Sequence, residues 1–142
     1  MNLSQRMKGT EYYEYVNINP KGKHGSDCVI RAIANACEQS WEVTVREMTE
    51  LGIKKGLILN DKKLYPLYLK EKGFHQMKEP RKSNNTKMSV KEWLCSRDAH
   101  LWRNYRIVVS VGSHHVSSII NSKVQDTWNC SDNTMHKWWV RA

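Results

Sequence analysis

Cys28 stands where a polar loop gives way to an apolar helical pattern. The segment 25–34 begins with Gly25 and Ser26, and its apolar residues after Cys28 recur at helical spacing. Asp27 or Ser26 is expected to cap this helix, which runs to about Glu38. Unpaired backbone N–H groups and the positive end of the helix dipole favour a thiolate in the first turn. The sequence therefore predicts a nucleophilic cysteine.

A base for this thiol is expected in a late β-hairpin. Residues 115–120 and 123–128 read as strands, and residues 121–122 form the connection between them. A two-residue turn makes the last residue of the first strand pair with the first residue of the second. That register puts His115 and Asp126 on one face of the hairpin as diagonal neighbours, within reach of each other.

The identity of the histidine depends on the turn. A three-residue loop would put His114, instead of His115, on the face of Asp126. With either register, an imidazole oriented by a carboxylate is the base that a cysteine nucleophile requires. The chain thus has a candidate Cys28, His115 and Asp126 triad, provided that the helix packs on this sheet.

The order of elements is helices first and strands later. This order predicts one α+β domain over residues 1–142, in which the helix that carries Cys28 packs on a C-terminal antiparallel β-sheet. Further helices are expected from Ser40 or Thr44 to Gly52, within 64–72, and from a capping box that begins at Ser89. Strands are expected near 11–18, over 105–111, in the hairpin, and near 137–140.

With these residues in place, the chain resembles the papain-like cysteine peptidase superfamily. The resemblance rests on residues 17–23, which lead into residues 27–32, then on His115-Val116 and on residues 126–128, in that order. The layout is most similar to the small phage and mobile-element members and to bacteriocin-leader-processing peptidases. It implies a cysteine-dependent hydrolase or transferase that acts on an amide or isopeptide bond of a protein or peptide substrate. Cys28 would attack the carbonyl, His115 would exchange the proton, and Asp126 would orient the ring.

The sequence departs from the family pattern at the oxyanion site. Members usually have a glutamine a few residues before the cysteine, and this chain has Gly22 there. Asn19 and Asn17 are the nearest amide donors that could replace it. Otherwise, oxyanion stabilisation rests on backbone N–H groups.

The charge is concentrated in the middle of the chain. The formal net charge is +9, and residues 54–91 hold 11 Lys and Arg against three acidic residues. This segment could attract an acidic protein, a nucleotide signal or a nucleic acid. The alternative function is therefore a catalytically inactive papain-like binding module, of the kind suited to a phage counter-defence protein. The candidate partner-binding residues are Lys54, Lys55, Lys62, Lys63, Arg81 and Lys82.

Cysteine usage indicates a reducing, cytoplasmic environment, which would be the host cytoplasm for a phage-encoded protein. The four cysteines form no C-x-x-C pair, and the N-terminal residues lack the apolar run of a signal peptide. No apolar stretch is long enough to span a bilayer. His114 and His115 are adjacent, and no zinc-ligand spacing surrounds them. We therefore expect no membrane insertion, no metal and no cofactor, and leave the oligomeric state open.

Overall fold

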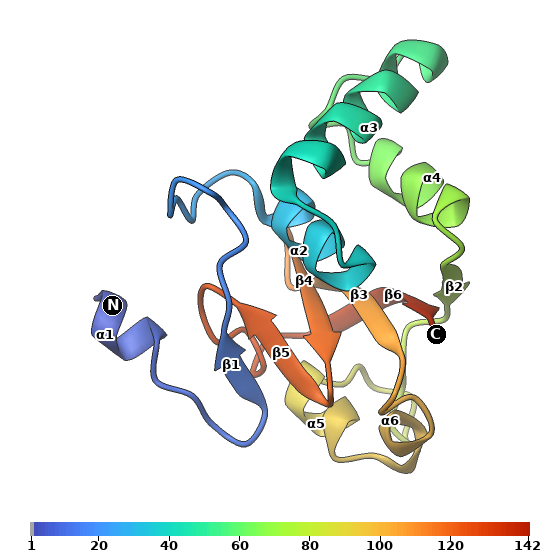
Figure 1. The fold of residues 1–142 in the computed structure, drawn as a ribbon. Coiled ribbons are helices and arrows are strands. Elements are labelled where there is room, and N and C mark those ends of the chain that lie inside the picture. Colours follow the sequence, from blue (N-terminus) through green and yellow to red (C-terminus); the bar gives the residue numbers. More distant parts are fainter. Residues whose placement is uncertain (1) are drawn as a thin grey trace.

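The computed structural model describes residues 2–142 and shows an α+β fold built on one six-stranded sheet (Figure 1). The strand order across the sheet is β1-β5-β4-β3-β6-β2. The strands are β1 (Tyr13–Tyr15), β2 (His75–Met77), β3 (Arg106–Val111), β4 (His115–Ile120), β5 (Lys123–Asp126) and β6 (Met135–Arg141). The helices are α1 (Leu3–Arg6), α2 (Cys28–Cys37), α3 (Trp41–Lys55), α4 (Leu64–Glu71), α5 (Val90–Leu94) and α6 (Arg97–Leu101).

The sheet is mixed, so the prediction of an antiparallel sheet is wrong at one edge. The four central strands β5, β4, β3 and β6 pair antiparallel. At one edge, however, β1 runs parallel to β5, with Tyr13 opposite Val124. The N-terminal strand can take this direction because the whole helical region separates it from β5 along the chain.

The β4–β5 hairpin has the register that a two-residue turn predicts. Ile120 pairs with Lys123, and Ile119 pairs with Val124. The two turn residues, Asn121 and Ser122, both have positive φ angles, 53° and 62°. Two such residues are characteristic of a tight turn whose twist matches that of the strands.

Helices cover both faces of the sheet. On one face, Ile33 of α2 packs with Val116 and Ile120 of β4. On the other face, Ile119 packs with Trp93 of α5. Because side chains alternate along a strand, those of His115 and Ser117 project from β4 on the same face as Ile119, which is the face opposite α2. The body of α2 therefore covers the face opposite the one from which the histidine and aspartate side chains project.

α3 begins at one of its two predicted starts and ends later than predicted. The Ser40 hydroxyl accepts the Val43 N–H at 3.1 Å, so of the two starts, Ser40 and Thr44, the structure has Ser40. The helix continues through Gly52 and ends at Gly56, whose φ of 71° suits a left-handed cap. Gly52 is small for a packing reason, since a Cβ there would lie 2.3 Å from the Leu57 carbonyl oxygen.

The other predicted helices agree with the structure. The Ser89 hydroxyl and the Glu92 carboxylate form a reciprocal capping box at the start of α5. The short α6 and the three-residue β2 were not predicted, because so few residues show no clear periodicity. Within residues 2–142, no helix has the length and apolar character that crossing a membrane requires.

We expect the Gly52→Ala substitution to lower the free energy of unfolding by about 1–3 kcal/mol through the clash with the Leu57 carbonyl. This effect opposes the intrinsic helix preference for alanine, which is about 1 kcal/mol. Urea denaturation followed by circular dichroism measures the change. Gly25→Ala is the matched control, because nothing lies within 4 Å of its added Cβ and its φ is not positive. Equal stability of the two variants would contradict the packing role of Gly52.

Candidate active site

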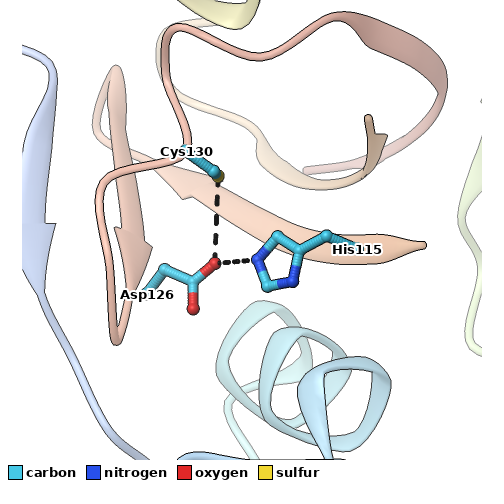
Figure 2. Close-up of side chains that lie close together, drawn as sticks. All are labelled: His115, Asp126 and Cys130. Carbon is cyan, nitrogen blue, oxygen red and sulfur yellow. Dashed lines mark hydrogen bonds and ion pairs between the residues drawn. The ribbon is translucent and has the colours of Figure 1, made fainter. Parts of the chain in front are cut away.

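His115 and Asp126 meet at the end of the sheet, where β4 begins and β5 ends. The His115 Nε2 atom lies 2.6 Å from Asp126 Oδ2, as the diagonal relation in the hairpin predicts (Figure 2). The His115 ring also contacts Trp128, with 4.9 Å between ring centroids. His114 is exposed in the turn before β4. Of the two histidines that the sequence left open, the structure therefore brings His115 to the carboxylate.

The Asp126 side chain is held at both of its oxygens. Oδ2 accepts the Ser117 hydroxyl at 2.6 Å in addition to the His115 ring. Oδ1 accepts the Thr127 backbone N–H at 2.7 Å and lies 3.9 Å from the Arg31 guanidinium. The residue is only 5% exposed. These contacts hold the carboxylate in one orientation toward the ring.

Cys28 is the first residue of α2 and is half-buried. Burial by itself raises the pKa of its thiol, but interactions with the His115 ring and the Val116 backbone outweigh burial and lower it. The nearby Arg31 charge lowers the pKa of Cys28 further. Because Nε2 of His115 faces Asp126, the ring nitrogen available to the sulfur is Nδ1, which Figure 2 shows on the side of the ring toward the α2 ribbon.

The pKa of His115 moves in the opposite direction. Burial by itself lowers it, but the hydrogen bond to Asp126 and interactions with the thiols of Cys130 and Cys28 raise the pKa to about 11. A lowered thiol pKa next to a raised imidazole pKa favours transfer of the proton from sulfur to nitrogen. The two shifts together increase the fraction of the pair that is present as a thiolate and an imidazolium.

Asp27 precedes α2, but its side chain does not cap the helix, contrary to the prediction. The carboxylate instead pairs with Arg31, accepts the Trp41 indole N–H at 2.9 Å, and accepts the Asn19 amide at 2.9 Å. These three donors compete successfully with the backbone N–H groups. Two consequences follow: the Arg31 charge balances the carboxylate beside Cys28, and the carboxylate leaves the N–H groups of the first turn uncapped.

The two asparagines considered for the oxyanion site form hydrogen bonds in the preceding loop. Asn17 donates from its amide to the Lys23 carbonyl at 3.1 Å. Asn19 donates to Asp27 and accepts the Lys21 backbone N–H at 2.8 Å. The loop therefore brings Asn19 next to the residue before Cys28, while Asn17 stays with the loop backbone.

Cys130 lies beside the candidate triad, a position that no sequence pattern predicted. This fully buried thiol lies 3.9 Å from Asp126 Oδ2 (Figure 2). The ligand atoms of His115, Asp126 and Cys130 lie within 4.8 Å of one another, close enough to be considered as a metal site. However, the donors around a tetrahedral zinc ion lie more than about 3 Å apart, whereas the imidazole and carboxylate atoms are 2.6 Å apart. That separation matches a direct hydrogen bond and not two ligands of one ion.

The predicted partner-binding residues fall in two separate places. Lys82 pairs with Glu92 at 2.7 Å, and Arg81 lies 3.8 Å from Glu79, so both are partly neutralised. The other four lie at the end of α3 or just before α4, and within residues 2–142 no ion pair involves them. These four are Lys54, Lys55, Lys62 and Lys63.

We expect Asp126→Asn to shift the pH dependence of Cys28 alkylation to higher pH. Without the carboxylate, the pKa of His115 falls from about 11 toward the ordinary value of about 6.5. The imidazolium is then lost at neutral pH, and the pKa of Cys28 rises. Rates of iodoacetamide alkylation between pH 5 and 10, measured for the Cys28 peptide by mass spectrometry, check this expectation.

The matched control is Asp98→Asn, because Asp98 accepts a hydrogen bond from Trp93 and not from His115. This control should leave the pH profile of Cys28 unchanged. An unchanged profile in Asp126→Asn as well, with both variants folded by circular dichroism, would show that the carboxylate does not tune the thiol.

Three elements therefore supply the candidate site: Cys28 comes from α2, His115 from β4 and Asp126 from β5. The first turn of α2 reaches the histidine at the end of the sheet, although the body of the helix covers the opposite face. No family model, curated protein or solved structure matches the chain.

Proposed function

We propose that this protein is a cysteine-dependent hydrolase or transferase that acts on an amide or isopeptide bond of a protein or peptide. The observation that carries the proposal is the position of His115, whose Nε2 bonds Asp126 at 2.6 Å while its interaction with Cys28 lowers the pKa of the thiol. A nucleophile, a base and a group that orients the base are the three components of such a site.

The proposed reaction begins with attack of the Cys28 thiolate on the substrate carbonyl carbon. A C–S bond forms, and the carbonyl π electrons move to oxygen. The uncapped backbone N–H groups in the first turn of α2 are suited to stabilise this oxyanion. The tetrahedral intermediate then collapses, the C–N bond breaks, and the His115 imidazolium gives its proton to the leaving amine.

The second half of the reaction releases the acyl group. His115, now neutral, accepts a proton from water or from an acceptor amine as that nucleophile attacks the thioester carbon. The C–S bond breaks, and its electrons return to sulfur, so the thiolate and imidazolium are restored. Asp126 keeps the ring oriented in both halves, and Ser117 and Thr127 hold Asp126.

A papain-like fold is part of this proposal. The order of Cys28 on an N-terminal helix, then His115 and Asp126 on strands of the following sheet, supports it, as does the packing of α2 against β4. A phage or mobile-element protein working in reducing cytoplasm would suit the four free cysteines.

A binding module without catalysis is the second candidate function. The four lysines near the α3–α4 connection, which have no ion-pair partner within residues 2–142, favour it. Such a module would bind an acidic protein, a nucleotide or a nucleic acid. Its binding would weaken steeply with added salt and would be unaffected by Cys28→Ala.

We expect Cys28 to react with iodoacetamide at pH 6 faster than the other three cysteines, although Cys95 is the exposed one. Its lowered pKa raises the thiolate fraction of Cys28 above that of an ordinary thiol at the same pH. Mass spectrometry of each cysteine-containing peptide, in native and in urea-denatured protein, measures the selectivity. Equal labelling of all four thiols in both states would sink the idea of a tuned nucleophile.

We expect Cys28→Ala to reduce amide hydrolysis by more than about 1,000-fold, since the variant has no nucleophile to form the thioester. Release of a fluorescent amine from a mixture of peptidyl-coumarin substrates measures the activity. Cys95→Ala is the control, because its thiol is exposed and donates a hydrogen bond to the Tyr12 hydroxyl at the surface. Comparable loss in both variants would contradict a specific role for Cys28.

A further inference from the structure

A cleft of about 260 Å³ opens beside the candidate active site. His115 and Val116 line one side, Val29 of α2 contributes to the apolar wall, and Leu59 and Lys62 come from the α3–α4 connection. The cleft thus links the connection between two helices to the residues that contact the Cys28 thiol. Burial raises the pKa of Tyr65, another lining residue, and the nearby Cys28 adds to this rise.

The last turn of α3 and the α3–α4 connection also expose several aliphatic side chains. Figure 1 shows α3 and α4 side by side, with α3 extending away from the sheet beyond α2. Ile53 is 78% exposed and Ile58 is 72% exposed, and Leu59 is 39% exposed at the edge of the cleft. Large aliphatic groups left in water near a cleft indicate a contact surface for a partner.

Along residues 53–63 the charges are mostly positive, while Lys54 also lines a hollow with Glu47, Glu50 and Glu71. Lys54, Lys55, Lys62 and Lys63 flank the exposed aliphatic groups, and Asp61 is the only acidic residue between positions 53 and 63. Within the described part of the chain, none of these lysines forms an ion pair. The complementary partner is therefore acidic and carries apolar groups.

The side chains of this surface favour a polypeptide over a nucleic acid. Single-stranded nucleic acid is commonly bound by exposed aromatic rings on which bases stack. Here Tyr65 packs edge-on against Trp139, and Tyr68 is buried. The basic groups are also lysines, which lack the planar fork of arginine for phosphate. Exposed isoleucine and leucine instead match aliphatic side chains of a peptide.

We propose that the surface at the α3–α4 connection docks an acidic segment of the polypeptide substrate. This docking surface is formed by Ile53, Ile58, Leu59, Lys54, Lys55, Lys62 and Lys63. An aliphatic side chain of that segment enters the cleft between Leu59 and Val29, and the chain continues to Cys28. The inference rests on the proposed function and specifies its substrate: a polypeptide in which acidic residues surround an aliphatic residue.

An affinity-labelling experiment tests this docking. A short peptide of alternating glutamate and leucine with a C-terminal iodoacetyl group should alkylate Cys28 at least about 10-fold faster than iodoacetamide, because binding raises the local concentration of the reagent. A lysine and leucine peptide with the same group should show no such acceleration. Lys54→Glu combined with Lys62→Glu should remove most of the acceleration for the acidic peptide.

The control variant combines Lys91→Glu with Arg97→Glu, which changes the net charge equally on α5 and α6 at the other face of the sheet. It should retain the acceleration. Equal alkylation rates for the acidic and basic peptides, or equal losses in the two double variants, would overturn the docking surface.

Fluorescence anisotropy with Cys28→Ala separates docking from catalysis. A fluorescein-labelled glutamate and leucine peptide should bind this variant about 10-fold more tightly than it binds a protein that also carries Lys54→Glu and Lys62→Glu. If that ratio holds while Cys28 lacks selective reactivity at pH 6, the docking surface stands and the proposed catalysis fails. Tighter binding of a labelled single-stranded DNA, lost in the same variant, would overturn the polypeptide partner.

Discussion

The hydrogen bond between Asp126 and His115 is the constraint on which the site depends. It joins the end of one strand to the start of its neighbour, so it exists only in one register of the hairpin. Asp126 is nearly fully buried, and a buried carboxylate requires several donors. Ser117, Thr127 and His115 provide them, and the Arg31 guanidinium lies 3.9 Å away as an ion-pair partner. The hydrogen bond between His115 and Asp126 therefore both helps to satisfy the buried carboxylate and fixes the orientation of the imidazole.

The features that could be predicted from the sequence are those set by short-range geometry. A two-residue turn and the period of two along a strand are enough to place His115 beside Asp126. The apolar pattern after the polar loop is enough to place Cys28 at the start of a helix. The meeting of the two is a long-range contact, which periodicity alone does not determine.

The features that the sequence did not predict depend on contacts between distant segments. The parallel pairing of β1 with β5 joins residues more than a hundred positions apart. Gly52 looks like a helix terminator, yet it lies inside α3 because the Leu57 carbonyl packs against it. Asp27 looks like a helix cap, but its carboxylate is bound by Arg31 and by the Trp41 indole, which comes from the next helix. In each case a tertiary partner overrides a sound local rule.

Arg31 connects two parts of the molecule that would otherwise be independent. Its guanidinium pairs with Asp27 at the head of α2 and lies 3.9 Å from Asp126 at the end of β5. Fraying of the first turn of α2 would therefore displace the Cys28 sulfur. The same local event would remove the Arg31 guanidinium from Asp27 and from Asp126. Thiol reactivity would then disappear at denaturant concentrations too low to disturb the central strands, so that inactivation precedes global unfolding.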